Sequence, residues 1–248
     1  MSRENEVYAL AANGATAPGG YTEAFKNLKA SVEQIGYLGV RTIKSYDPQL
    51  CAAQCDPGQG CLAFNIYFKR EPSFDTNSGS CSNPPSTTNI KCTLYGFPVS
   101  AEAATNKGSF LNRFEVATAG SNGYTRSPIL SPRPNGGDYN SPTELQCAIN
   151  APLDPETRKN THVGTAAFKT AFDPAQCAAA CNTHNQYHTS RPNAEDGTYP
   201  ACNFFNSYVL YKNNVPESLV CTMYSRSWDE SLAVNCGQWR GQDHYTIG

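Results

Sequence analysis

Residues 46–55 read YDPQLCAAQC, and residues 172–181 repeat the pattern as FDPAQCAAAC. Asp47 and Asp173 are good helix N-caps, and the proline after each one sits at the first helical position, where a missing N–H costs nothing. The alanines that follow favour a helix. Two cysteines at i and i+4 then lie on one helix face, from which both can be tied to the same sheet. The stretch therefore predicts, at two places in the chain, a helix fastened to a sheet.

Three more blocks recur in the same order after these stretches. Residues 61–67 (CLAFNIY) match 202–208 (CNFFNSY), residues 92–95 (CTLY) match 221–224 (CTMY), and residues 104–108 (ATNKG) match 233–237 (AVNCG). The connections between the blocks differ in length between the copies, as surface loops do. The chain therefore contains two related modules.

The second and third blocks have the pattern of strands. Leu62, Phe64, Ile66 and Phe68 alternate with smaller or polar residues, which predicts a strand with one strongly buried face. Residues 92–95 and 221–224 are predicted to be short strands as well. Each module is thus expected to be an α+β unit, in which one helix packs on an antiparallel sheet.

The repeat also sets the expected boundaries. We place module 1 at residues 31–125 and module 2 at residues 155–248. Residues 126–154 are the linker, because the stretch 127–138 (SPILSPRPNGGD) is rich in proline, glycine and serine. Residues 1–30 are expected to be a flexible N-terminal segment in which residues 21–28 form a short helix.

Composition narrows the class of protein. Charged residues make up 16% of the 248 residues and the net charge is −2, so nothing favours nucleic acid or an anionic membrane as a partner. The chain has 11 cysteines, which is too many for an ordinary cytosolic protein. No Cys-x2-Cys pair occurs, so disulfides are favoured over a structural metal. An odd number leaves at least one cysteine without an internal partner.

The start of the chain is at odds with an oxidising compartment. The first six residues (MSRENE) are polar, and no apolar signal segment follows them. Either a signal peptide is missing from this chain or the protein is exported by another route. Because the cysteines need an oxidising environment, we expect a secreted protein whose signal peptide is missing here.

A helix with Cys-x3-Cys, followed by Cys-x-x-Phe and then Cys-x-Leu-Tyr, resembles the PAN/apple module, and the resemblance covers both copies. The two-copy layout is similar to uncharacterised secreted proteins of filamentous fungi. The resemblance implies two disulfide-stapled modules, each a curved antiparallel sheet with one helix packed on it. It also implies a protein without catalytic residues that binds protein or carbohydrate.

The resemblance further implies a set of disulfides. The first helix cysteine pairs with the cysteine of the Leu-Tyr strand, and the second pairs with the cysteine before the phenylalanine. The implied bridges are Cys51–Cys92, Cys177–Cys221, Cys55–Cys61 and Cys181–Cys202. Three cysteines have no counterpart in the other copy: Cys81, Cys147 and Cys236. We expect a Cys147–Cys236 bridge that pins the linker to module 2, which leaves Cys81 unpaired or joined to another chain.

Catalytic and metal-binding motifs are absent from the sequence. There is no Gly-x-Ser-x-Gly elbow, His-Glu-x-x-His motif or phosphate-binding glycine loop. His184 and His188 are spaced i, i+4, which suits two metal ligands on one helix face, but no third ligand completes the set. A solvated loop is the favoured interpretation of these histidines. We therefore expect no enzyme, no cofactor and no metal.

Aromatic residues are the other candidates for a site. When the two copies are aligned, Trp228 corresponds to Val99 and Trp239 corresponds to Phe110. Because both counterparts are apolar, both tryptophans are predicted to lie in the core. Tyr211, opposite Arg70, is the better surface candidate. Four recurring residues, Tyr67, Tyr208, Asn65 and Asn206, are expected to be structural, and Asn106 and Asn235 are expected to form turns.

The sequence leads to two hypotheses. The first is a non-catalytic secreted protein that recognises an extracellular glycan or protein through its modules. The alternative is a structural or self-assembling extracellular or cell-wall protein, a homo-oligomer whose contacts involve the module surfaces and Cys81. The sequence assigns no ligand-binding residue to either hypothesis.

Overall fold

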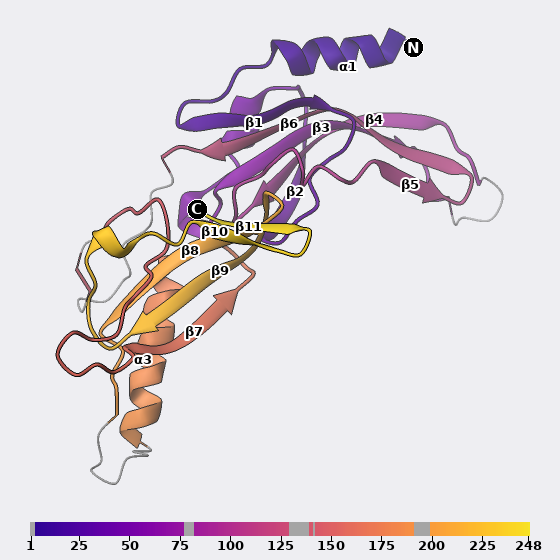
Figure 1. Ribbon diagram of the computed structural model, residues 1–248. Coiled ribbons are helices and arrows are strands. Elements are labelled where there is room, and N and C mark those ends of the chain that lie inside the picture. The colour runs from indigo at the N-terminus through magenta and orange to yellow at the C-terminus, as the bar shows by residue number, and fades with distance from the viewer. Residues whose placement is uncertain (1–2, 77–81, 129–138, 141, 191–198) are drawn as a thin grey trace. The chain divides into compact units, whose positions relative to one another are not determined.

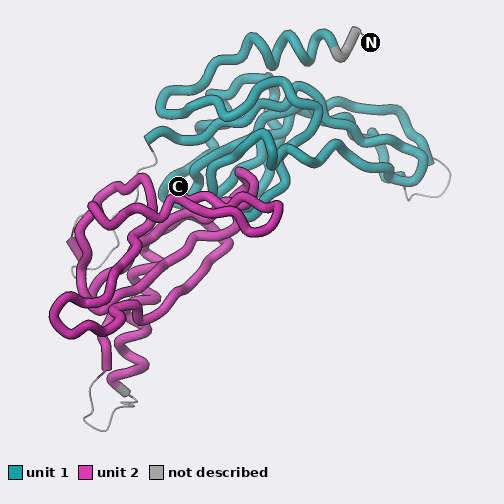
Figure 2. The backbone as a smooth tube through the Cα atoms, in the orientation of Figure 1, with its two compact units in different colours: residues 1–129 teal, residues 130–248 magenta. Residues whose placement is uncertain are grey.

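The structure is a computed structural model that describes residues 3–76, 82–128, 139–140, 142–190 and 199–248. The chain divides into two compact units, residues 1–129 and residues 130–248 (Figure 2). Each unit has its own antiparallel sheet, so the fold is α+β with few helices. No helix in the described ranges is long and apolar enough to cross a membrane.

Unit 1 is built on a six-stranded sheet with the order β1-β6-β3-β4-β2, and β5 pairs with one end of β6 (Figure 1). Its strands are β1 (Tyr21–Leu28), β2 (Tyr37–Ile43), β3 (Ala63–Pro72), β4 (Ser86–Tyr95), β5 (Gly108–Leu111) and β6 (Phe114–Arg126). Its helices are α1 (Arg3–Gly14), α2 (Pro48–Ala52) and a 3₁₀ turn, Pro57–Gln59.

Unit 2 has a five-stranded sheet with the order β10-β11-β8-β9-β7. Its strands are β7 (His162–Phe168), β8 (Phe204–Lys212), β9 (Val215–Tyr224), β10 (Gly237–Arg240) and β11 (Asp243–Ile247). Its helices are α3 (Pro174–Ser190), which packs on the sheet (Figure 1), and a 3₁₀ turn, Glu230–Leu232.

The two units share one strand order over most of the sheet. The series β2, α2, β3, β4, β5, β6 corresponds to β7, α3, β8, β9, β10, β11, and the recurring blocks occupy the same places in both. A backbone bridge before each series also recurs, as Ser31 with Asn106 and Ala148 with Asn235. The sequence repeat is therefore a structural repeat.

The prediction of a short helix at residues 21–28 was wrong. Residues 21–28 form β1, an edge strand paired with β6, and α1 precedes them. Tyr8 of α1 stacks on Phe68 of β3 at 4.4 Å between ring centroids, and Ala12 is fully buried. Tertiary contacts with the sheet, which no local pattern reports, therefore decide the structure of this segment.

The two predicted helices begin where expected, but they differ in length. Asp47 accepts from the N–H of Gln49 and Asp173 from the N–H of Ala175, both at 2.9 Å. Helix α2 ends at Ala52, so Cys55 lies beyond the helix and not on it, contrary to the prediction. The sequence after Cys55 is Asp-Pro-Gly, which starts a separate 3₁₀ turn, whereas no proline or glycine interrupts α3.

The central strand of unit 1 is buried on both faces, not on one face as predicted. Phe64 and Ile66 pack into the disulfide-containing core beside α2. On the opposite face, the Oδ1 of Asn65 accepts from the N–H of Val32 at 2.9 Å, and the hydroxyl of Tyr95 donates to Val32 O at 2.7 Å. The segment around Val32 therefore covers the second face of the sheet.

Five disulfides join ten of the 11 cysteines. They are Cys51–Cys92, Cys55–Cys61, Cys147–Cys236, Cys177–Cys221 and Cys181–Cys202. These are the five pairs expected from the sequence. Cys81 lies outside the described residues, as does most of the stretch 127–138 in the predicted linker.

The Cys147–Cys236 bridge has a clear structural role. Cys147 directly precedes Ala148 and Cys236 directly follows Asn235, so the bridge reinforces the backbone pair that joins the start of unit 2 to its last hairpin. In unit 1 the equivalent Ser31–Asn106 pair has no disulfide beside it, but β1 fastens the same segment to β6. The covalent bridge thus replaces an interaction between strands.

Candidate binding surfaces

The β10–β11 hairpin carries the most exposed large aromatic side chain of unit 2. Trp239 is 68% exposed, and its ring stacks on the imidazole of His244, with centroids 4.5 Å apart and an interplanar angle of 17°. The two residues lie directly opposite each other in the hairpin register, which holds the rings together. The result is a flat, exposed aromatic surface whose indole packs on a second ring.

Glycine makes this hairpin possible. Gly237 has a φ of 131°, and a Cβ atom there would lie 2.1 Å from the carbonyl oxygen of Tyr245. Its counterpart Gly108 has the same constraint, since a Cβ atom would lie 2.0 Å from Val116 O. The Oδ1 of Asn106 also accepts from the N–H of Gly108 at 3.1 Å, which forms the predicted turn.

The other face of the hairpin is charged. The guanidinium of Arg240 lies 4.5 Å from the ring centroid of Tyr245. Asp243 forms an ion pair with Lys212 at 2.8 Å and accepts from the Nδ2 of Asn213 at 2.9 Å. These interactions lower the pKa of Asp243 and raise that of Lys212, so both stay charged at neutral pH. The hairpin therefore offers an aromatic face and a polar face.

The prediction that Trp239 lies in the core was wrong, and the reason is visible in both units. Phe110, its counterpart in β5, is 70% exposed. Strands β5 and β10 each lie at the end of their sheet and pair only with the following strand. All four residues of each strand are exposed. An aromatic residue recurs at this position on the surface of both units.

Trp228 is only partly buried, so it is neither the core residue that the sequence predicted nor a fully exposed one. Its Nε1 donates to Thr161 Oγ1 at 3.1 Å, and the Arg226 guanidinium lies 5.0 Å from its ring centroid. Arg226 also pairs with Asp154 at 2.6 Å. Hydrogen bonds from the Thr157 backbone and from Arg226 hold the pKa of Asp154 well below its usual value. Trp228 is thus fixed within unit 2 and is a poor contact residue.

The tyrosines also differ from one another. Tyr211, the predicted surface candidate, is partly buried, and this burial raises its pKa to about 12. It is therefore not an open platform for a ligand. Tyr67 is buried and its hydroxyl lies 3.2 Å from Thr93 Oγ1, which confirms its structural role. Burial also raises the pKa of Tyr208.

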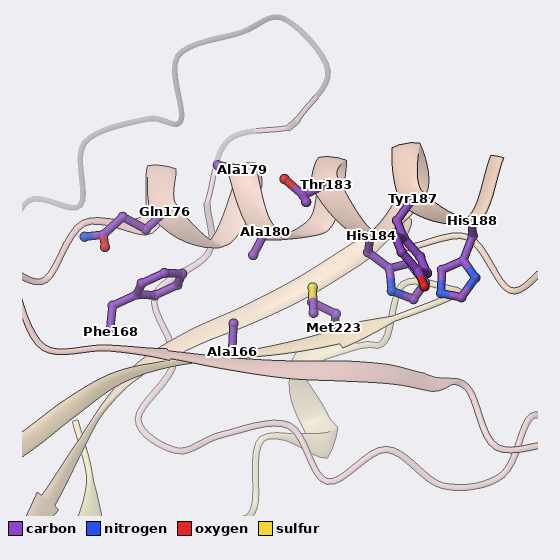
Figure 3. A pocket seen from close by; sticks show the side chains of 10 residues that line it. All are labelled: Ala166, Phe168, Gln176, Ala179, Ala180, Thr183, His184, Tyr187, His188 and Met223. Atoms are coloured by element: carbon purple, nitrogen blue, oxygen red, sulfur yellow. The ribbon is translucent and has the colours of Figure 1, made fainter. Parts of the chain in front are cut away.

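A second surface is the groove between α3 and the sheet of unit 2, with a volume of about 600 Å³. Figure 3 shows Ala180 of the helix facing Ala166 and Met223 of the sheet, with Tyr187 at one end and Phe168 at the other. The lining is mostly apolar. The corresponding helix of unit 1, α2, has 5 residues against 17 in α3, so it offers a shorter wall at the equivalent place.

The two predicted histidines lie at the tyrosine end of this groove (Figure 3). The rings of His184 and His188 are 4.5 Å apart, and the Nε2 of His184 lies 3.2 Å from Pro200 O. They lie on α3, not in a loop as the sequence favoured. No third histidine, cysteine or carboxylate completes a metal-binding group within the part of the chain that the structure describes.

The shifted pKa values described above follow from ion pairing, from hydrogen bonding or from burial of tyrosines. What both surfaces share is exposed apolar and aromatic area, the property of a contact surface. Comparisons with protein-family models, with curated proteins and with solved structures found no match to this chain.

Proposed function

We propose that this chain is a non-catalytic extracellular binding protein with two PAN/apple-type modules, which recognises a glycan through the Trp239 hairpin of unit 2. The observation that carries the proposal is the exposed Trp239 ring stacked on His244. A pyranose ring presents an apolar face of C–H groups, and such a face packs well on a flat aromatic ring. Because His244 already orients the indole, little conformational entropy is lost on binding.

A polar group beside the indole supplies the second requirement of sugar recognition. Thr246 lies two residues after His244 in β11, so its side chain projects from the same face of the hairpin as Trp239. Its hydroxyl can hydrogen-bond to a hydroxyl at the edge of a sugar ring. Gln238 and Arg240 project from the opposite, polar face, because side chains alternate along β10. Trp is also one of the residue types enriched at binding hot spots.

The disulfides support the extracellular setting. Five bridges in a chain of 248 residues are typical of proteins that fold in an oxidising compartment. The PAN/apple assignment rests on the two ordered sets of cysteine blocks and on the sheet-plus-helix units that contain them. Modules of this type have no catalytic residues of their own, and the proposal of a non-catalytic protein rests on that resemblance.

The test is binding to a panel of purified cell-wall polysaccharides, followed by tryptophan fluorescence. Replacing Trp228 by Phe leaves Trp239 as the only indole, and a bound sugar should shift its emission to shorter wavelength. Trp239→Ala should weaken binding about tenfold or more, which corresponds to about 1.4 kcal/mol. The matched control is Tyr187→Ala, on the α3 groove of the same unit, which should bind like the unaltered protein.

Two outcomes would contradict the proposal. If Trp239→Ala binds as the unaltered protein does while Tyr187→Ala loses binding, the contact surface is the groove. If no polysaccharide binds, recognition of a glycan is wrong.

A self-assembling extracellular protein remains the second candidate, because Phe110 and Trp239 expose aromatic rings at equivalent places in both units. Such paired apolar residues are suited to contacts between copies. This candidate predicts oligomers that increase with concentration and are lost in a Phe110→Ser, Trp239→Ser double variant. Sedimentation velocity over a hundredfold range of concentration separates it from the first candidate, which predicts a monomer.

A further inference from the structure

Unit 1 has a polar hollow on the face of its sheet that lies opposite α2. Tyr67 of β3 and the residues Thr93 and Tyr95 of β4 line it, together with Tyr37 of β2 and the segment of residues 31–34. Its volume is about 400 Å³. A volume of this size falls within the range of pockets that hold small molecules.

The part of the hollow formed by the sheet carries buried hydroxyls. The hydroxyls of Tyr67 and Thr93 lie 3.2 Å apart, and the hydroxyl of Tyr95 donates to Val32 O at 2.7 Å. A hydroxyl has one donor and two acceptor positions, so these bonds leave acceptor capacity on the oxygens. The sheet therefore gives the hollow a polar lining that is fixed by packing.

A charged array lies further along β3, beyond the part of the strand that holds the Val32 segment. The carboxylate of Glu71 pairs with Lys69 at 3.1 Å and with Lys91 at 2.7 Å. It also accepts from the Nδ2 of Asn89 at 2.7 Å, and Lys91 donates to Thr42 Oγ1 at 3.2 Å. Because a lysine has three N–H donors, both ammonium groups keep donors beyond these bonds.

The array is charged and partly shielded from water. Burial on its own raises the pKa of Glu71, but hydrogen bonds from Lys91, Asn89 and Lys69 outweigh it and lower that pKa below its usual value. The side chain of Lys91 is only 16% exposed and that of Glu71 only 22%. Glu33 adds a second carboxylate to the lining. Two lysines and two glutamates then leave no net charge, which favours a neutral ligand.

The segment of residues 31–34 brings an acceptor that the fold does not use. The Nε2 of Gln34 donates to Pro98 O at 3.0 Å, which fixes the orientation of the amide. Its Oε1 is buried and has no hydrogen-bond partner among the residues that the structure describes. Unused acceptors of this kind are uncommon in folded proteins, and this one belongs to a residue that lines the hollow.

Tyr37 gives the hollow an exposed aromatic ring. The side chain is 58% exposed, and its ring meets that of Tyr95 edge-on, with centroids 6.3 Å apart and an interplanar angle of 70°. Because Tyr95 is buried and bonded to Val32 O, it braces the exposed ring. An apolar face of a ligand can therefore pack on Tyr37 at little cost in conformational entropy.

The second copy of the fold shows that the charged array is not needed for folding. The hydroxyl-bearing residues of the lining recur in unit 2, as Tyr208, Thr222 and Tyr224. The three positions of the array are occupied there by Leu210, Lys212 and Val220. The same sheet therefore forms with two apolar residues at these positions, so the array of unit 1 is better explained by a ligand than by stability.

We propose that this hollow of unit 1 binds a neutral sugar ring, at a site separate from the Trp239 hairpin. Lys69 and Lys91 donate to the ring hydroxyls, and the oxygens of the lining accept from them. The apolar C–H face of the ring packs on Tyr37. The inference concerns unit 1 alone, so it holds or fails independently of the role of Trp239.

The probes are the methyl glycosides of glucose, galactose, mannose, xylose and N-acetylglucosamine, tested by saturation-transfer difference NMR. The protein is the full chain with Trp239→Ala, which removes the other proposed sugar contact. At least one of these neutral glycosides should bind this chain. Glucuronic acid serves as the charged comparison, and it should not bind in preference to the neutral glycosides.

The variants that locate the site are Lys91→Met and Tyr37→Ser, each added to the Trp239→Ala chain. The first removes an ammonium group and keeps a side chain of similar length, and the second removes the exposed ring. Each should weaken binding of the glycoside about tenfold or more. Lys44→Met is the matched control, because Lys44 is an exposed lysine of unit 1 outside the hollow, and it should leave binding unchanged.

Thermal unfolding of each variant shows whether unit 1 stays folded. Tyr37 is exposed, so its variant tests the site even where Lys91→Met is unstable. The proposal is overturned if no neutral glycoside binds, if neither Lys91→Met nor Tyr37→Ser weakens binding, or if glucuronic acid alone binds. A glycoside that binds the Trp239→Ala chain supports this site even where polysaccharide binding proves independent of Trp239, so the two proposals fail separately.

Discussion

Asn65 and Asn206 show how one residue type has different consequences in two copies of a fold. Both amides hold the segment that covers the outer face of the sheet, through Val32 and Ile149 respectively. Only Asn65 also uses its Nδ2, which joins β3 to β6. The sequence repeat predicted the shared role correctly. It could not predict the difference, because the acceptors of Asn65 lie in a part of β6 that the repeat does not include.

This difference can be measured by substituting aspartate, which keeps the acceptor oxygen and removes the donor. Asn65→Asp should lower the free energy of unfolding of unit 1 by about 1–3 kcal/mol, because two buried acceptors lose their donor and face a carboxylate. Asn206→Asp should have a clearly smaller effect on unit 2. Hydrogen exchange followed by mass spectrometry resolves the two units, and equal losses in both would contradict this account.

At the scale of elements, local signals decided the starts of the helices and distant contacts decided the rest. The capping residues Asp47 and Asp173 and the proline after each one were sufficient to predict where α2 and α3 begin. Strand β1 was not predictable, since residues 21–28 form a strand only because β6 lies beside them. The exposure of Trp239 was missed for a related reason: a repeat shows which residue type recurs, but not whether its strand lies at an uncovered edge.

The Cys147–Cys236 bridge yields a prediction at this scale. Because it closes a loop with a sequence separation of 89 residues, a Cys147→Ser, Cys236→Ser double variant should lose about 4–5 kcal/mol in the chain-entropy model. The Cys55–Cys61 bridge closes a loop with a sequence separation of only 6. A Cys55→Ser, Cys61→Ser double variant should therefore lose only about 2 kcal/mol of unfolding free energy. Denaturant unfolding of both variants tests the order. A larger loss for the short loop would show that strain or packing outweighs loop closure.

At the scale of the whole molecule, the two copies share a fold but differ in their exposed features. In unit 1, β6 pairs with the central strand β3, β1 pairs with β6, and Phe110 is exposed. Unit 2 has the stacked Trp239 and the groove beside α3. The sequence predicted that the two copies share a fold, since caps, cysteines and core asparagines recur. It did not show that they differ in their surfaces, because those features arise from residues outside the repeated blocks.

The most direct test of the central claim, two disulfide-stapled copies in an extracellular binding protein, is peptide mapping without reduction of protein purified from the culture medium of its native source. The account predicts the linkages Cys51–Cys92, Cys55–Cys61, Cys147–Cys236, Cys177–Cys221 and Cys181–Cys202. Reduced thiols at these positions, or linkages that join the two units, would contradict both the two-copy architecture and the oxidising compartment on which the proposed function depends.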